Sequence, residues 1–288
     1  TVFAVSVVLA AFMAGLGFGS YLFGYTVDKL SANSIDSSST ALQLYGWIEI
    51  MIFASGSVLS LLFANFAEIY SLFHSVVPDS PPIQNLLKVI FSFTLILVPT
   101  TFMGATLPLI SKYCVMDNKH IGTQVSLLYA LNTLGAASGC MVTGFFLMGT
   151  FGVLQTVLMA AACNLFIGIS ALSIFKENGG TIKFSFPTIN FPKLRWSPEQ
   201  KFWMGISFIC GFTALAYEVL WTRLLVFSIA STVYSFSMML TVFLLGIFLG
   251  SLLLIPLLSK IKNLRTILIA LQGGVGISVS YTHLRAHE

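Results

Sequence analysis

Charged residues are scarce in this chain. Only 8% of its 288 residues are Asp, Glu, Lys or Arg, against about a quarter in soluble domains. Such a composition excludes an ordinary soluble globular domain. The net charge of +4 does not indicate a nucleic-acid partner, because in a membrane protein the placement of Lys and Arg matters more than their sum.

Cysteine and histidine are also few, with four of each. Cys114, Cys140, Cys163 and Cys210 lie in or beside apolar stretches without the spacing of a disulfide framework or a metal site, so we interpret them as small core residues. His283 and His287 are four residues apart, but the sequence offers no third ligand and no catalytic Glu between them. We therefore expect no metal and no cofactor.

Long apolar runs dominate what remains, since 57% of the residues are hydrophobic and 26 are Phe. A membrane-spanning helix needs about 20 predominantly apolar residues, because its backbone groups must be satisfied within the segment. We expect an all-α, polytopic transmembrane helix bundle in a lipid bilayer, with about eight spans. They are predicted at 2–25, 42–64, 86–110, 123–148, 152–175, 202–228, 232–258 and 264–280.

The positive residues segregate between the two ends of these spans. If alternate connections face the same side, one side has eleven of the fourteen, namely Lys29, Lys112, Lys119, Lys176, Lys183, Lys193, Arg195, Lys201, Lys260, Lys262 and Arg265. By the positive-inside rule this side is cytoplasmic. The polar, proline-containing segment 176–201 is then a cytoplasmic linker between two groups of helices, and we expect the bacterial inner (plasma) membrane.

An internal repeat relates the first predicted span to the seventh. Residues 1–22, "TVFAVSVVLAAFMAGLGFGSYL", align without a gap with 232–253, "TVYSFSMMLTVFLLGIFLGSLL". Identical residues include Gly15 with Gly246 and Gly19 with Gly250. The span at 202–228 has no counterpart, because its partner would precede residue 1. We expect 1–175 to be an N-terminal bundle lacking its first helix and 202–280 to begin a second bundle, a parallel repeat that resembles a truncated major facilitator fold.

Glu218 and Arg223 interrupt the apolar span at 202–228. A carboxylate at the centre of a spanning helix costs about 2.5–3.5 kcal/mol on insertion scales, so we expect Glu218 to face the bundle interior and to bind a substrate or ion. Two interpretations of Arg223 remain. It either pairs with Glu218 or, with Tyr217 and Trp221, belongs to an aromatic belt with a snorkelling cation.

Other intramembrane groups are weaker candidates for a site. Glu49 either provides a second negative site or lies near the cytoplasmic interface and is solvated, while Asn132 is expected to bond a neighbouring helix. Gly104 and Pro108 are expected to break a helix and free carbonyl groups. Gly135 and Gly139 form a G-x-x-x-G motif that allows close helix packing.

A short motif follows the first span. "GYTVDK" resembles the G-x-x-x-D-[RK] motif between the second and third helices of major facilitator transporters, which would make Asp28 a gating residue. The family's following basic residues are absent, because "LSANSIDSSST" comes next.

Several segments together carry a more specific resemblance. "GFTALAYEVLWTRLL", "MLTVFLLGIFLGS", "FMGATLPLISKY" and "LLYALNTLGAASG" are similar to the membrane region of the fused major facilitator/spermidine synthase proteins. The resemblance implies an attached soluble aminopropyltransferase-like domain, which this chain lacks. "LQGGVG" at 271–276 lies in an apolar span and is interpreted as helix packing, so no catalytic residue is assigned.

Two functions remain open from the sequence. One is a transporter-like module for a polyamine or another small cation, with Glu218 and Glu49 as negative sites. The other is a membrane anchor or scaffold for an attached aminopropyltransferase in polyamine biosynthesis. The tail 281–288, "YTHLRAHE", resembles a translated sequencing adapter, and we expect it to be non-native.

Overall fold

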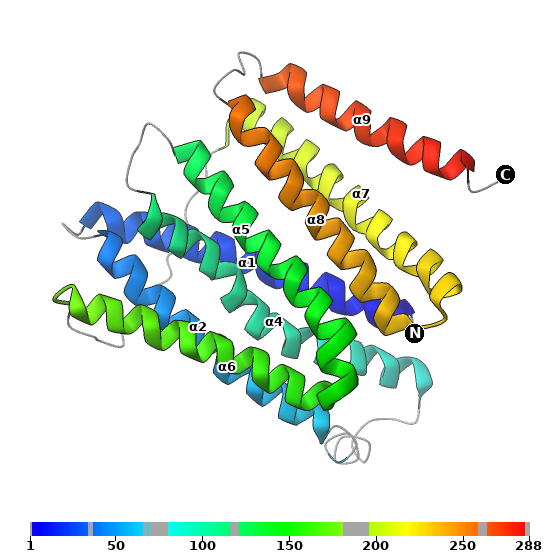
Figure 1. Ribbon diagram of the computed structural model, residues 1–288, viewed down its shortest axis with the longest axis horizontal. Helices are drawn as coiled ribbons and strands as arrows, with labels where there is room; N and C mark the ends of the chain where they lie inside the picture. Colours follow the sequence, from blue (N-terminus) through cyan, green and yellow to red (C-terminus); the bar gives the residue numbers. More distant parts are fainter. Residues whose placement is uncertain are drawn as a thin grey trace.

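The computed structural model describes residues 2–33, 37–65, 68, 80–115, 121–180, 196–258 and 264–285 (Figure 1). Within these ranges every regular element is a helix, which confirms the all-α fold class. The elements are α1 (Val2–Asn33), α2 (Ser37–Ala64), α4 (Pro81–Cys114), α5 (Ile121–Val142), η1 (Thr143–Leu147), α6 (Met148–Glu177), α7 (Pro198–Ile229), α8 (Thr232–Leu258) and α9 (Leu264–Arg285).

Local sequence fixes the ends of α7. Ser197 and Gln200 form a capping box, in which each side chain bonds the backbone N–H of the other residue, and Pro198 occupies the first turn, where no donor is lost. The helix ends where Ala230 adopts a left-handed conformation with φ 57°. This turn leads directly into α8, so that α7 and α8 form a helical hairpin (Figure 1).

Within the described ranges, six helical runs are long and apolar enough to cross a membrane, rather than the eight expected. Residues 121–177 form one run of 57 residues that replaces two predicted spans. The helical conformation is interrupted inside it at Gly152, with φ 76° and ψ 174°, and α6 turns back from α5 at this point (Figure 1). In the eighth predicted span, the described residues Thr266–Ser278 form a shorter apolar helix.

The contacts between helices define their arrangement in the bundle. α1 lies on α4, α2 lies between α4 and α6, and α8 lies between α5 and α7. Successive helices alternate in direction, and α1 and α8 both run from the lower right to the upper left of the view (Figure 1). A parallel repeat requires this common direction for the two helices.

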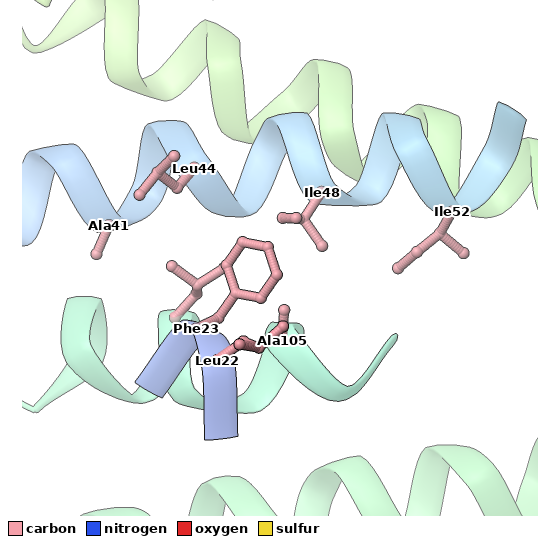
Figure 2. Packing of buried hydrophobic residues seen from close by; sticks show 8 residues of the cluster. Leu22, Phe23, Ala41, Leu44, Ile48, Ile52 and Ala105 are labelled. Atoms are coloured by element: carbon pink, nitrogen blue, oxygen red, sulfur yellow. The ribbon is translucent and has the colours of Figure 1, made fainter. Parts of the chain in front are cut away.

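The main hydrophobic core joins α1, α2 and α4. Figure 2 shows the α2 side chains pointing toward Phe23, Leu22 and Ala105. The cluster consists of Leu22, Phe23, Ala41, Leu44, Ile48, Ile52, Ala105 and Leu109. Outside it, large apolar side chains are exposed, such as Phe227 at 85% and Phe208 at 75%. Such exposure suits a chain whose outer surface contacts lipid.

Glycines permit the closest helix contacts. Gly15 and Gly19 of α1 lie against Thr100 and Thr101 of α4, and Gly104 of α4 lies against the backbone of Leu16. A side chain at any of these glycines would collide with the other helix. The two helices therefore approach each other along a Gly-x-x-x-Gly face.

The other predicted glycine face does not pack in this way. Gly135 and Gly139 of α5 have open space where a side chain would stand, so their predicted role in close packing is wrong. The buried face of α5 instead carries Ala130, Thr133 and Ala137. These three residues share a face because they are three and four positions apart, and that face is turned away from the two glycines.

Candidate functional site

Glu218 lies inside the bundle, as expected from the sequence. Its side chain is 1% exposed. The fully buried residues of α7 are Glu218 and Thr222, while its apolar side chains point outward or are partly buried. A helix that turns its polar residues inward and its apolar residues outward has the polarity expected in lipid rather than in water.

Helices α5 and α8 define the surroundings of Glu218. Gly144 in η1 packs directly against the side chain of Ser237 in α8, and α5 and α8 run in opposite directions (Figure 1). Cys140, one turn before Gly144, is therefore at the level of Thr241, one turn after Ser237. The Cys140 thiol is close enough to the Glu218 carboxylate for its charge to be felt there, in agreement with a position of Glu218 near this level.

Polar residues of α8 complete the site. Ser235, Ser237 and Thr241 are buried in this helix, together with Met239. Ser237 and Thr241 are four residues apart and share the face of α8 that meets Gly144, whereas Ser235 and Met239 share the opposite face. Buried hydroxyl groups therefore lie on two faces of α8.

Neither carboxylate oxygen of Glu218 has a hydrogen-bond partner among the described residues. Thr222 donates to the backbone carbonyl of Glu218 at 2.8 Å, and Thr241 donates to the carbonyl of Ser237 at 2.7 Å. The hydroxyl hydrogens of both threonines are thus directed to their own helices. A buried carboxylate without a donor is costly, so this group requires a proton or a ligand.

Arg223 does not supply that partner. It is exposed on α7 and lies five residues beyond Glu218, a spacing that does not give an ideal same-face pair on a helix. The rings of Tyr217 and Trp221 stack with centroids 5.9 Å apart. Arg223 is thus an outward cation that does not pair with Glu218, and the aromatic belt of Tyr217 and Trp221 stays a prediction.

Glu49 lies in a separate part of the bundle, between α2 and α6. It is 5% exposed, so it is buried and not solvated. The Tyr45 hydroxyl, one turn earlier, donates to the Glu49 carboxylate, and the Glu49 stem faces Gly168 of α6, where a side chain would be crowded. Glu49 is therefore held by a local hydrogen bond and is not brought together with Glu218.

The remaining candidates have other roles or positions. Asn132 is exposed on α5 and forms no bond to a described residue of a neighbouring helix, so the expected interhelical bond is not found. The side chain of Asp28 lies outside the described part of the chain, although α1 continues as a helix beyond the predicted end of the span. The gating role of Asp28 stays a prediction.

Gly104 and Pro108 do not break α4, contrary to expectation. The helix continues through Pro99 and Pro108. Pro108 has no N–H for the carbonyl of Gly104, four residues earlier, and Ser20 of α1 donates to this carbonyl at 2.8 Å. The freed carbonyl is thus used in helix packing and is not left to a substrate.

Sequence reasoning missed Thr222, Thr241 and Cys140. The signal for Thr222 was available, because a residue four positions after Glu218 shares its face. Thr241 and Cys140 come near the site only through the register of α5 and α8. A second missed feature is η1, a π-helical segment one turn from Cys140. Such segments occur frequently at functional sites.

In comparisons with known proteins, no family model, no curated protein and no solved structure matches the chain. Among the described residues, no group of three or more His, Cys, Asp or Glu side chains is arranged to hold a metal ion.

Proposed function

We propose that this chain is a membrane transport module that moves a small cation past Glu218. The observation that carries this proposal is the burial of Glu218 at 1% exposure without a hydrogen bond to either carboxylate oxygen. A purely structural carboxylate in an apolar bundle would be expected to have a donor, as Glu49 has in Tyr45. An unpartnered carboxylate instead favours a site whose partner enters and leaves.

The arrangement of the helices supports the same proposal. If the 57-residue run crosses the membrane twice, by turning at Gly152, and α9 crosses as well, the chain has the eight spans expected from the sequence. α1 and α8 would then be equivalent members of a parallel repeat of the major facilitator type. The linker 176–201 would be cytoplasmic and would join the two bundles.

The substrate class follows from charge and from the sequence resemblance. A carboxylate attracts a cation, and the segments around Glu218 resemble the fused major facilitator/spermidine synthase proteins. A polyamine is therefore the first substrate to test. An attached soluble aminopropyltransferase-like domain would be the partner of this module in the bacterial inner membrane.

The experiment measures uptake of radiolabelled spermidine into liposomes that contain the purified full chain. We expect uptake above that of protein-free liposomes and a reduction of about tenfold or more in the variant Glu218→Gln, which keeps the shape of the side chain but loses its charge. Glu199→Gln is the matched control, because Glu199 is exposed in the first turn of the same helix. Equal uptake by Glu218→Gln and the unmodified chain would refute the transport role and favour a membrane anchor for the attached enzyme.

A further inference from the structure

Two threonine hydroxyls near Glu218 can only accept hydrogen bonds from a ligand. The Thr222 and Thr241 hydroxyls donate to backbone carbonyls of their own helices, so only their oxygen lone pairs remain for a ligand. The hydroxyl of Ser235, which is also buried in α8, has no partner among the described residues and can donate or accept. The two Glu218 oxygens add further acceptor positions. The Cys140 thiol is a weak donor at best.

Among the described side chains of α1, α5, α8 and α9, none is positively charged. Between Ala4 and Thr26 the titratable side chains of α1 are Tyr21 and Tyr25, and between Thr232 and Pro256 that of α8 is Tyr234. Tyr234 stacks on Phe145, at the end of α8 next to the α7 turn. From α5, Cys140 is the titratable group that interacts with Glu218. The described side chains of these helices therefore supply no positive charge to compensate Glu218.

Divalent metal ions fit this site poorly. Divalent cations prefer several carboxylate or carbonyl oxygens, whereas here one carboxylate is present and the described residues form no group of three possible ligands. A quaternary ammonium ion has no N–H group and cannot use the threonine oxygens. A cation with N–H or O–H donors can satisfy the carboxylate and the hydroxyl oxygens at once.

We infer that the occupant of the Glu218 site is a singly charged hydrogen-bond donor, either a proton or one small protonated amine group, and not a divalent metal ion or a quaternary ammonium. This inference rests on the proposed function for the location of the site, but it concerns the chemistry of the ligand. A proton converts the carboxylate itself into a donor to a threonine oxygen, while an ammonium group donates to both.

The test uses the melting temperature of the detergent-solubilised full chain, because a ligand that binds only the folded state stabilises it. At equal ionic strength, methylammonium chloride is compared with tetramethylammonium, sodium, potassium and magnesium chlorides, and a separate series lowers the pH. We expect a rise of about 3 °C or more with methylammonium, with acid, or with both. The first result identifies an amine as the occupant and the second a proton.

Two variants tie the effect to the site. In Glu218→Gln the stabilisation by methylammonium and by acid should be lost, whereas Glu199→Gln should keep it. Thr241→Val preserves the shape of the side chain but removes the hydroxyl oxygen that would accept a hydrogen bond from the ligand. This variant should therefore reduce the stabilisation by methylammonium. Equal stabilisation by tetramethylammonium or a metal ion, no stabilisation by any condition, or stabilisation that persists in Glu218→Gln would each overturn the inference.

The two proposals can fail separately. Selective stabilisation by methylammonium or acid without spermidine uptake would leave the site chemistry intact and refute transport. Uptake that depends on Glu218, together with stabilisation by tetramethylammonium equal to that by methylammonium, would support transport and overturn the ligand chemistry.

Discussion

Ser20 of α1 donates a hydrogen bond to the Gly104 carbonyl of α4 across the tightest helix contact in the bundle, with 2.8 Å between Oγ and O. Within α4 this carbonyl has lost its usual donor, because the residue four positions later is Pro108. A proline on one helix is thus compensated by a serine on another. Ser20 thus forms one structural unit with Gly104 and Pro108, although it lies 84 residues from Gly104 in the sequence.

We predict that Ser20→Ala destabilises the chain by about 0.6 kcal/mol, and by no more than about 1.7 kcal/mol, the range measured for interhelical hydrogen bonds in membranes. The melting temperature in detergent measures this effect. Ser251→Ala is the matched control, because Ser251 is the repeat equivalent of Ser20 in α8 and forms no hydrogen bond to another described residue. Equal losses in both variants would show that the Gly104 bond contributes nothing.

Gly19→Ala is predicted to destabilise the chain by about 1–3 kcal/mol, because its new methyl group would collide with the Thr101 carbonyl. The repeat again provides the control. Gly250 corresponds to Gly19 but has open space around it, so Gly250→Ala should change stability by less than about 0.5 kcal/mol. A thermal shift in the Gly250 variant as large as that in the Gly19 variant would contradict the described α1–α4 packing.

Gly144 and Ser237 should be energetically coupled. Gly144→Ala places a methyl group on the Ser237 side chain and should destabilise the chain, whereas adding Ser237→Gly should restore most of the loss. In a double-mutant cycle on melting temperatures, residues in contact show coupling of about 0.5–3 kcal/mol. Additive effects would mean that the register of α5 and α8, and with it the level assigned to Cys140 and Thr241, is wrong.

Much of the fold was predictable because lipid imposes a simple rule on sequence. Each spanning segment must satisfy its own backbone and present an apolar surface, so the helices and the burial of Glu218 could be inferred from the residues alone. The direction shared by α1 and α8 was expected from the repeat of Gly15 and Gly19. The requirements that lipid places on a single helix can therefore be inferred from the residues of that helix.

Contacts between helices were much less predictable. Gly135 and Gly139 have the same spacing as Gly15 and Gly19, yet only the second pair meets another helix. The difference lies in how far each helix is rotated about its axis, which depends on its neighbours. For the same reason Pro108 was expected to open the helix, although Ser20 satisfies the carbonyl that it frees. The hydrogen-bond partners of a polar group therefore depend on the tertiary structure and cannot be inferred from one helix alone.

Tyr45→Phe is predicted to destabilise the chain by about 1–3 kcal/mol, because it removes the hydroxyl that donates to the buried Glu49 carboxylate. The melting temperature measures this loss. Tyr129→Phe is the control, since Tyr129 is 40% exposed. Adding Glu49→Gln to Tyr45→Phe should restore part of the stability, because the double variant no longer contains an unpaired carboxylate. No loss in Tyr45→Phe would mean that the Tyr45–Glu49 bond is not formed.

A topology experiment decides how often the 57-residue run crosses the membrane. Reporters are inserted in segments 69–79 and 181–195, which lie on either side of α4, α5 and α6 in the chain. If the run turns at Gly152 and crosses twice, three crossings separate the two insertions and they fall on opposite sides. If it crosses once, two crossings separate them and they fall on the same side.

We predict that the two reporters lie on opposite sides. At 1.5 Å per residue the run would be about 85 Å long when straight, whereas the hydrocarbon core is about 30 Å thick. Because Lys176, Lys183, Lys193, Arg195 and Lys201 flank or lie within the second site, the positive-inside rule further predicts that a fluorescent protein at 181–195 is active in the cytoplasm and that alkaline phosphatase is active only at 69–79. Alkaline phosphatase activity at 181–195 would reverse the orientation, and the same reporter active at both sites would reduce the run to a single crossing.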